Sequence, residues 1–209
     1  MPPAPLRIIG QALTGLIARA PFVWPVLRTP IRRFFDRIAP QWDERTAVDS
    51  PERLVPLAAA LDHVVEPPAR AIDLGTGTGA AALMLARRYS EARVVGVDIS
   101  EPMIAAAQAK LQGTELGGRV EFDVEDIAAL PYGDGAFDLV AQVSTPVFFD
   151  EIVRVLAPSG YVAIISSLGS ATPFHTPELV LERGFRRRGL EVVARGGAGP
   201  GTFFVARRR

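Results

Sequence analysis

The residues most able to do chemistry lie in two short runs of small, acidic and β-branched residues. Asp73 is followed by glycine at alternate positions, Gly75, Gly77 and Gly79, and Asp98 lies about 20 residues beyond the turn. A glycine turn lets a ligand approach the backbone because no Cβ stands in the way. A helix that starts there points unpaired N–H groups and its positive dipole end at the ligand. These residues therefore favour a nucleotide-like or carboxylate-bearing small molecule.

Strands and a helix must hold these residues together. The apolar run before Asp73 and the β-branched run that begins at Arg93 both have the character of strands, and helix-forming residues extend from Ala80 to Tyr89. Asp98 would then end a second parallel strand, where a carboxylate can accept hydrogen bonds from both ribose hydroxyls. A solvated or helix-capping aspartate is the weaker alternative, because the turn and the acid occur together at the separation of a nucleotide site.

Two classes of cofactor use this geometry, and Asp73 separates them. Gly75, Gly77 and Ala80 fit the looser fingerprint of nicotinamide- or flavin-binding folds, in which a pyrophosphate rests on the helix N-terminus. Asp73 stands two residues before the first glycine, where its charge would repel a pyrophosphate and attract an ammonium group. The residues therefore favour a ligand that carries a positive charge.

The glycine run and four later segments resemble a known family. Asp73-Leu74-Gly75-Thr76-Gly77-Thr78-Gly79 resembles motif I of the class I S-adenosylmethionine-dependent methyltransferases. The later segments look like the family's second-strand acid with its helix, its adenine-binding segment, its fourth strand, and the helix and turn before its fifth strand: Val97–Ile104, Asp126–Tyr132, Phe137–Val140 and Glu151–Gly160. The similarity covers residues 68–167 closely and is nearest to the small-molecule methyltransferases.

The resemblance implies S-adenosylmethionine as the cofactor, bound across the glycine turn. Asp73 is then expected near its ammonium group, Asp98 on its ribose, and Asp126 at the amino group of adenine. The full set of expected cofactor-binding residues is Asp73, Gly75, Thr76, Gly77, Gly79, Asp98, Ile99, Met103, Glu125, Asp126, Ile127, Gln142 and Val143. No metal is expected.

The residues that would act on the methyl acceptor are less evident. Methyl transfer gains much from positioning, and a base is needed only if the acceptor must lose a proton. His175, in the loop after the expected fifth strand, is a candidate base, but a capping or exposed loop histidine is the favoured interpretation. The catalytic residue is therefore unknown. Ser144, at the end of the fourth strand, is expected to contact the acceptor.

The N-terminal run Arg33–Asp43 resembles the opening segment of many small-molecule methyltransferases, including the quinone-biosynthesis group. In those proteins an aromatic-Asp pair folds over the cofactor as part of a lid, and Trp42 and Asp43 are the corresponding residues here. An aromatic helix that merely packs on the domain is an alternative of equal weight.

The chain is expected to form a doubly wound α/β fold, with a mostly parallel seven-stranded sheet, helices on both faces and a C-terminal antiparallel hairpin. Residues 1–50 should form an N-terminal helical extension, a possible lid, and residues 51–209 the methyltransferase domain. Pro21, Pro25 and Pro30 should break the extension into short pieces after its first helix. Strands are expected near 70–74, 93–97, 119–123, 137–143, 160–167, 190–194 and 202–206, with helices near 51–65, 79–90, 101–112, 147–156 and 176–188.

Composition gives the chain no strong electrostatic preference. Positive and negative side chains number 23 each, so no global field points to nucleic acid or to a membrane. Six arginines and one acid precede residue 40, a run that we interpret as a solvated basic face. The apolar segment 6–27 is interrupted by Arg19, Pro21 and Pro25 and should not span a bilayer. A cytoplasmic location is expected.

The expected activity is that of an enzyme, methyl transfer from S-adenosylmethionine to a small-molecule acceptor. Only Ala141–Asp150 separates the fourth strand from the next helix, where related enzymes carry a longer loop that lines the acceptor pocket. A cofactor-binding protein without catalysis is therefore one alternative, and a methyltransferase of protein or RNA, supported only by the basic N-terminus, is another. The expected partner is a small-molecule acceptor and not nucleic acid. The apolar N-terminal extension is expected to dock on its own chain, with a second copy of the chain, in a homodimer, or a membrane surface as the alternatives.

Overall fold

The computed structural model describes residues 4–209, so the first three residues of the predicted N-terminal extension lie outside the described residues. Its centre is a seven-stranded sheet with the strand order β3-β2-β1-β4-β5-β7-β6. The strands are β1 (Arg70–Leu74), β2 (Arg93–Asp98), β3 (Val120–Val124), β4 (Phe137–Val143), β5 (Leu156–Ser166), β6 (Leu190–Ala198) and β7 (Gly201–Arg208). This sheet confirms the predicted fold class.

Strand pairing brings three strand ends together. Strands β1 to β5 pair in parallel, whereas β7 runs antiparallel to both β5 and β6. Leu74, the last residue of β1, pairs with Val97 on one side and with Gln142 on the other. The carboxyl ends of β2, β1 and β4 therefore lie side by side, at the edge where doubly wound sheets bind ligands.

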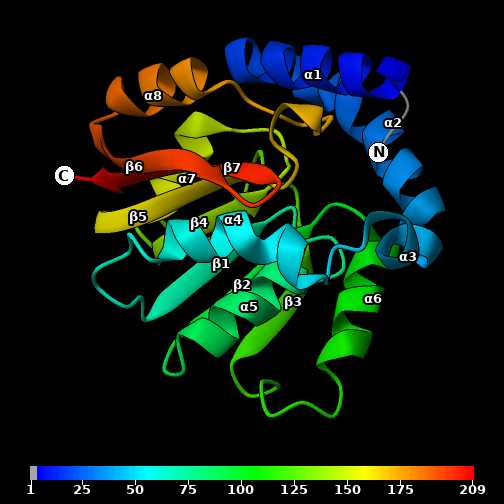
Figure 1. Ribbon diagram of the computed structural model, residues 1–209, viewed down its shortest axis with the longest axis horizontal. Coiled ribbons are helices and arrows are strands. Elements are labelled where there is room, and N and C mark those ends of the chain that lie inside the picture. The colour runs from blue at the N-terminus through cyan, green and yellow to red at the C-terminus, as the bar shows by residue number, and fades with distance from the viewer. Residues whose placement is uncertain (1–3) are drawn as a thin grey trace.

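Helices cover both faces of the sheet, and others lie over its edge (Figure 1). The main helices are α1 (Ala4–Arg19), α2 (Trp24–Ile38), α3 (Trp42–Thr46), α4 (Pro51–Leu61), α5 (Ala80–Arg88), α6 (Glu101–Leu111), α7 (Phe149–Val155) and α8 (Glu178–Arg186). Short 3-10 turns occur at η1 (Pro21–Val23), η2 (Ala39–Gln41) and η3 (Gly169–Ala171).

The two faces of the sheet belong to two separate apolar clusters. Leu57 of α4 and Leu85 of α5 pack with Ala71 of β1, and α6 joins the same cluster. The next residue of β1, Ile72, packs instead with Phe185 of α8 and with α7. Successive strand residues point to opposite faces, so one strand serves both clusters.

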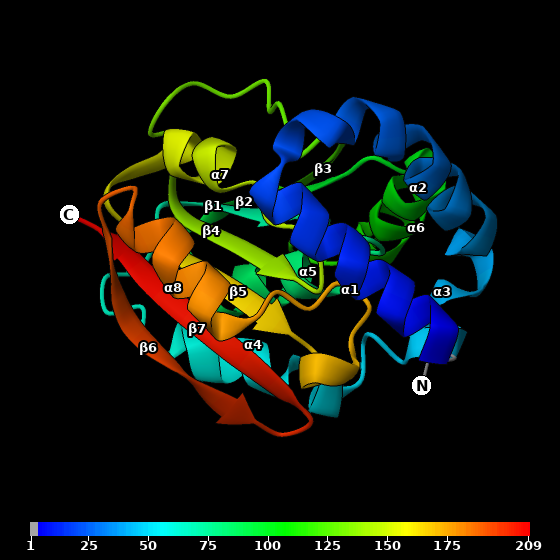
Figure 2. The same ribbon diagram turned by 90° about the horizontal axis from the view of Figure 1, so that it is seen from above.

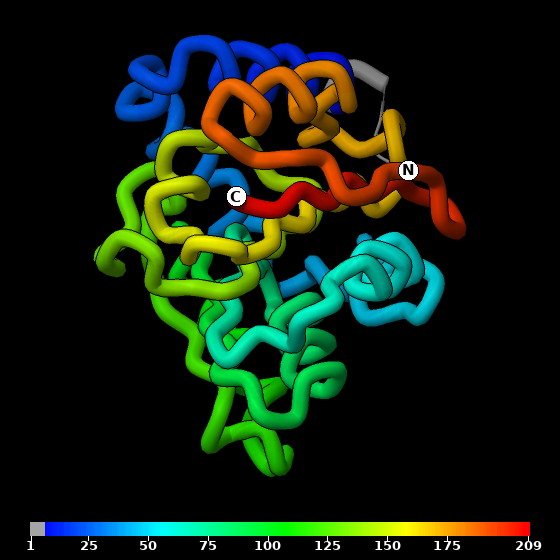
Figure 3. The backbone as a smooth tube through the Cα atoms, turned by 90° about the vertical axis from the view of Figure 1, so that its left-hand side faces the viewer, coloured from blue at the N-terminus to red at the C-terminus, as the bar shows by residue number. Residues whose placement is uncertain are grey.

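Helix α1 lies beside α8, and α2 continues from it over the carboxyl edge of the sheet toward α6, as Figures 2 and 3 show from two sides. Gln11 Nε2 donates to the carbonyl oxygens of Ser170 (2.6 Å) and Thr172 (3.2 Å). Ile17 of α1 is fully buried. Gly10 runs so close to the loop after η3 that an added Cβ would lie 2.6 Å from Pro173 Cβ. The extension thus docks on its own chain.

Predicted boundaries near proline and glycine were wrong. Helix α2 runs unbroken from Trp24, because Pro25 lies in the first turn, where an N–H has no helical partner, and Pro30 removes one interior hydrogen bond without ending the helix. Strand β5 begins at Leu156, before the expected start, and β6 continues through Gly196 into the expected loop. Among the described residues, no helix is long and apolar enough to cross a membrane.

Candidate active site

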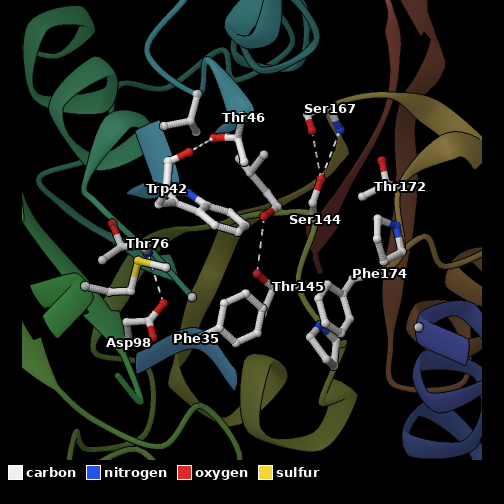
Figure 4. A pocket seen from close by; sticks show the side chains of 18 of the residues that line it. Phe35, Trp42, Thr46, Thr76, Asp98, Ser144, Thr145, Ser167, Thr172 and Phe174 are labelled. Carbon is white, nitrogen blue, oxygen red and sulfur yellow. Dashed lines mark hydrogen bonds between the residues drawn. The ribbon is translucent and has the colours of Figure 1, made fainter. Parts of the chain in front are cut away.

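A cavity of about 620 Å³ lies between the strand ends and the N-terminal helices. Its walls come from distant parts of the chain (Figure 4). One part of the wall is polar and consists of the glycine turn with the ends of β1 and β2. The rest is mainly apolar and comes from α1, α2, α3, the start of α4, and the loops after β4 and β5.

The glycine turn gives the cavity its narrow backbone wall. Gly75, Gly77 and Gly79 all have positive φ, at +68°, +55° and +88°, a region that L side chains rarely adopt. A Cβ on Gly77 would have Trp42 Nε1 as its nearest neighbour, at an ordinary contact distance of 3.8 Å. A Cβ on Gly75 would lie 2.5 Å from Thr145 Oγ1. The turn therefore leaves room for a ligand at Gly77 and packs tightly against the loop after β4.

Asp73 is a buried carboxyl group that lacks one partner. Thr76 Oγ1 donates to Asp73 Oδ2 at 2.6 Å, but Oδ1 is buried and has no hydrogen-bond partner among the described residues. Burial raises the pKa of Asp73 to about 7, because the charged form loses its water. A ligand with an ammonium group would supply both the missing donor and the missing positive charge.

Asp98 is held by backbone donors beside the turn. Gly77 N donates to Asp98 Oδ2 (3.0 Å) and Ser100 N donates to Oδ1 (2.9 Å). Burial raises the pKa of Asp98, and the nearby Asp36 of α2 raises it further. A carboxylate oxygen accepts more than one hydrogen bond, so this residue of the cavity wall can still accept bonds from a pair of ligand hydroxyls.

The structure brings most of the predicted site residues together around the cavity. Beside Asp73 and Asp98, the wall contains Gly75, Thr76, Gly77, Ile99, Met103, Ile127, Val143, Trp42 and Ser144. Within the described residues, the wall does not include Gly79, Glu125, Asp126, Gln142, Asp43 or His175.

Asp126 faces the N-terminal extension rather than the cavity. Trp24 Nε1 donates to both of its carboxylate oxygens, at 2.8 and 3.0 Å, and Arg28 Nη1 lies 3.4 Å from Oδ2. The Trp24 ring also packs edge-on against Phe148, with the ring centroids 5.1 Å apart. The predicted adenine-binding carboxylate therefore anchors α2 to the domain in this structure.

Three predicted site residues lie outside the cavity wall but support its structure: Gly79, Gln142 and Glu125. Gly79 caps α5 and packs so closely on Phe122 that a Cβ would meet that ring at 2.7 Å. Gln142 Nε2 donates to the carbonyl of Thr145 at 2.7 Å and so fixes the loop after β4. Glu125 N donates to the carbonyl oxygen of Asp98 at 3.0 Å.

The two predicted lid residues have different positions. Trp42 lines the cavity and packs edge-on against Phe35, with centroids 5.7 Å apart. Asp43 points to the domain, where it accepts a hydrogen bond from Thr78 Oγ1 (2.6 Å) and pairs with Lys110 Nζ (2.8 Å). Lys110 also pairs with Asp49 at 2.6 Å. These contacts fix the segment around α3 to the glycine turn and to α6.

His175 lies outside the cavity, in a small separate hollow beside α1. Its Nδ1 is 3.0 Å from Ser166 Oγ, and burial lowers its pKa. Ser144 does line the cavity, and its backbone has a positive φ of +54°. Its hydroxyl group forms a hydrogen bond with that of Ser167, with 3.0 Å between the two Oγ atoms. The acceptor side of the wall thus offers hydroxyl groups but no histidine among the described residues.

Sequence reasoning missed most of the apolar wall. Its helical part consists of Ile9, Gly10, Leu13, Trp24, Ile31, Phe34, Phe35 and Ile38. The spacing of Ile31, Phe34, Phe35 and Ile38 is that of one helix face, so the sequence did contain a signal. Two arginines, Arg45 and Arg53, also line the cavity, and no ion pair joins either of them to an acid in the described part of the chain.

Comparison with known proteins gives several matches. A family model for a methyltransferase domain matches residues 71–160. A demethylmenaquinone methyltransferase of Thermus thermophilus is 38% identical over 146 residues, which cover 63% of this chain and 63% of that protein. A malonyl-[acyl-carrier protein] O-methyltransferase of Geobacter sulfurreducens is 40% identical over 147 residues, which cover 65% of this chain and 52% of that protein. The chain thus spans less than two thirds of the length of either relative.

Solved structures share the fold at lower sequence identity. The [4+2]-cyclase SpnF superposes with a TM-score of 0.70 at 19% identity, covering 85% of this chain and 94% of that one. At this identity the likeness concerns the fold, and it agrees with the seven-stranded sheet described above.

Proposed function

Because this chain belongs to the class I S-adenosylmethionine-dependent methyltransferases, we propose that it transfers a methyl group from that cofactor to a small apolar acceptor. The observation that carries the proposal is a single cavity with a polar, acidic end and an apolar remainder. Both reactants would then lie in one cavity, and positioning of this kind supplies much of the rate enhancement in a displacement reaction.

The polar end of the cavity fits the cofactor. The unpartnered Oδ1 of Asp73 suits its ammonium group, and Asp98 suits its ribose hydroxyls. Gly77 lines the cavity opposite Trp42 and has no Cβ, so a ligand can lie along its backbone. We assign Arg45 and Arg53 to the cofactor's carboxylate, because they bring unpaired positive charge to the same cavity. When bound, S-adenosylmethionine supplies an electrophilic methyl group, and the residues of the chain bind, orient and exclude water.

The apolar part of the cavity supports a largely uncharged acceptor. Phe34, Phe35, Trp42 and Phe174 contribute aromatic side chains to its wall. Burial of an apolar acceptor against them is favourable by roughly 25 cal/mol per Å². The hydroxyl groups of Ser144, Thr145 and Ser167 can orient one polar group of the acceptor. The acceptors in the names of the two relatives, demethylmenaquinone and malonyl-[acyl-carrier protein], are starting points for a search.

Other expectations belong to the same proposal. We expect the protein to act in the cytoplasm and without a nucleic-acid partner. A homodimer formed through the N-terminal extension stays a prediction.

The test uses calorimetry and then a transfer assay with the full chain. S-adenosylhomocysteine should bind with micromolar or tighter affinity, and NADH should not bind. Methyl-labelled S-adenosylmethionine should then pass its label to a molecule in a small-molecule extract that partitions into organic solvent. Binding of NADH without binding of S-adenosylhomocysteine would refute the cofactor, whereas cofactor binding without any transfer would favour the non-catalytic alternative.

A further inference from the structure

The outer side of the N-terminal helices carries apolar side chains that the described chain does not cover. Ile8, Phe22 and Val26 are 62%, 81% and 77% exposed. Of the eleven large hydrophobic side chains that are exposed in the described residues, six lie between residues 8 and 34. Two of these six, Ile9 and Phe34, line the cavity, and the other four lie away from it: Ile8, Leu16, Phe22 and Val26. Exposure concentrated in one layer marks an interaction surface, whereas single exposed apolar residues are ordinary.

Helix α1 has two apolar sides, and only one of them contacts the domain. Its inner side holds Gly10, Thr14 and Ile17, all buried. Its outer side holds Ile8 and Leu16, which are separated by two helical turns and both exposed. The inner side accounts for docking on the domain, so the outer side needs a different occupant.

The same layer is strongly basic. Arg19, Arg28, Arg32, Arg33 and Arg37 are exposed, and Asp36 is the one acid before residue 40. Arg33 and Arg37 follow Val26 by seven and eleven residues, which places them on the same side of α2. Zero net charge does not cancel this local field, because exposed charges farther apart than about 10 Å are largely screened. Arg28 pairs with Asp126 and Arg32 with Asp36, whereas no ion pair joins Arg19, Arg33 or Arg37 to an acid of the described residues. The outer side therefore combines apolar side chains with the unpaired positive charge of these three arginines.

We propose that α1, η1 and α2 dock on the surface of an anionic lipid bilayer. Phe22 and Val26, at the corner between the two helices, enter the acyl-chain boundary, and the arginines contact the lipid phosphates. The homodimer considered from the sequence would need a different side of the extension, because a two-fold interface here would bring this basic patch onto itself. Figure 2 looks down on α1 and α2, the side that would face the bilayer.

Docking of this kind would deepen the proposed function. Ile9, Leu13, Ile31 and Phe35 of the same two helices line the cavity. One layer thus lies between the lipid surface and the acceptor part of the site, so that an apolar acceptor could pass from the bilayer into the cavity. This step rests on the proposed function, whereas the docking itself can be tested without catalysis.

The experiment is flotation of the full chain with two kinds of vesicle. Vesicles of equal parts phosphatidylcholine and phosphatidylglycerol should carry the protein, and vesicles of phosphatidylcholine alone should carry little. The double variant Phe22→Ser/Val26→Ser should lower partitioning at least tenfold, since each side chain gives up about 1.5–3 kcal/mol of burial. Arg33→Gln/Arg37→Gln should lower it by about 25-fold, since each charge near the surface contributes about 1 kcal/mol, or about fivefold.

Matched controls keep the test specific. Val65→Ser/Leu179→Ser removes two side chains of similar exposure (77% and 76%) outside the N-terminal layer, and Arg87→Gln/Arg93→Gln removes two exposed charges elsewhere. Both controls should float like the unchanged chain. Calorimetry with S-adenosylhomocysteine should give unchanged affinity for every variant, because none of the substituted residues lines the cavity.

Three outcomes would overturn the proposal. One is no flotation of the full chain with anionic vesicles, and another is an equal loss in the test and control variants. The third is a dimer in light scattering that Phe22→Ser/Val26→Ser dissociates, which would assign the surface to a second copy. If the chain without substitutions did not bind S-adenosylhomocysteine, the proposed function would be refuted, but the docking proposal would not be affected.

Discussion

The two ends of the cavity are built in different ways. The polar end comes mainly from neighbouring strand ends within residues 73–103, where backbone N–H groups hold Asp98 and the Thr76 hydroxyl holds Asp73. The apolar end comes from segments far apart in the chain, residues 9–54 and 143–174. A few polar contacts attach its helical part to the domain, chiefly Trp24 with Asp126 and Lys110 with Asp43. The acids proposed for the ammonium group and the ribose thus lie at the ends of sheet strands, while most of the apolar wall and Arg45 belong to a separately attached layer.

Removal of the N-terminal layer, residues 1–48, should have the largest effect, and it should impair methyl transfer far more than cofactor binding. In a variant that begins at Asp49, we expect methyl transfer to fall by on the order of 10³-fold or more, because the acceptor is no longer positioned. Affinity for S-adenosylhomocysteine should fall by about tenfold or less, or 1.4 kcal/mol, because the glycine turn and Asp98 remain. The measurements are single-turnover transfer and calorimetry, with circular dichroism as the control for folding. Undiminished transfer would show that the layer is no part of the acceptor site.

The charge of Asp73, at the polar end, should make cofactor affinity depend on pH. Asp73 has a pKa of about 7 in the folded chain, raised by burial, and an ammonium ligand favours its ionised form. Affinity for S-adenosylhomocysteine should therefore be level above pH 7 and weaken by about tenfold for each unit below it, since one pKa unit is 1.36 kcal/mol.

The same raised pKa of Asp73 changes the stability of the unliganded protein in the opposite direction with pH. Because the folded pKa of Asp73 lies above its ordinary value of 3.8, the unliganded fold should lose stability as pH rises from about 4 to about 7. Asp73→Asn should bind the ligand more weakly and abolish most of the pH dependence of both quantities. A variant that keeps the same pH profile would assign the titration to another group.

Loss of the ribose-binding acid should have the next largest effect. Asp98→Ala removes two charge-assisted hydrogen bonds to the ligand, each roughly 1.5–3 kcal/mol, and should weaken S-adenosylhomocysteine at least tenfold in calorimetry. The matched control is Asp123→Ala on the neighbouring strand β3, an exposed acid that should leave affinity unchanged. Equal affinities of the two variants would remove Asp98 from the site.

The smallest expected effect concerns Asp126, where the N-terminal helix α2 is attached to the domain. Trp24→Phe keeps an aromatic ring beside Phe148 but removes the donor to the carboxylate, and should lower the free energy of unfolding by about 1.5 kcal/mol in chemical denaturation. If Asp126 also binds adenine when the cofactor is present, Asp126→Leu should weaken S-adenosylhomocysteine far more than Asp126→Asn. Equal affinities would leave Asp126 as an anchor of α2 alone.

The sequence predicted which residues lie together at the polar end, because short-range geometry determines their placement. Gly75 and Gly77 need backbone angles that L side chains rarely adopt, and Asp98 follows at the spacing of one helix and one strand. The direction of an acid on a loop depends on partners that no local pattern reveals. Asp126 turns to Trp24, 102 residues away, and Asp43 turns to Thr78, 35 residues away.

The extension was the least predictable part of the fold. Pro30 indicated a break, yet α2 continues, since packing of one helix face can outweigh a lost backbone hydrogen bond. The aromatic spacing of residues 31–38 indicated a buried helix face but not which surface it would cover. That information lies in the tertiary structure, in contacts such as those of Gln11 with the loop after β5.

Lys110 gives this protein a built-in chemical reporter. It is the only lysine of the chain, so amine-reactive reagents have one side-chain target. Its ammonium group is shared between Asp43 and Asp49 and is mostly covered, and a paired ammonium is a poor nucleophile. Acylation at this one site would therefore proceed only while the α3 segment is lifted. Mass spectrometry of a single modified peptide could then follow how often the site opens, in cells as well as in purified protein.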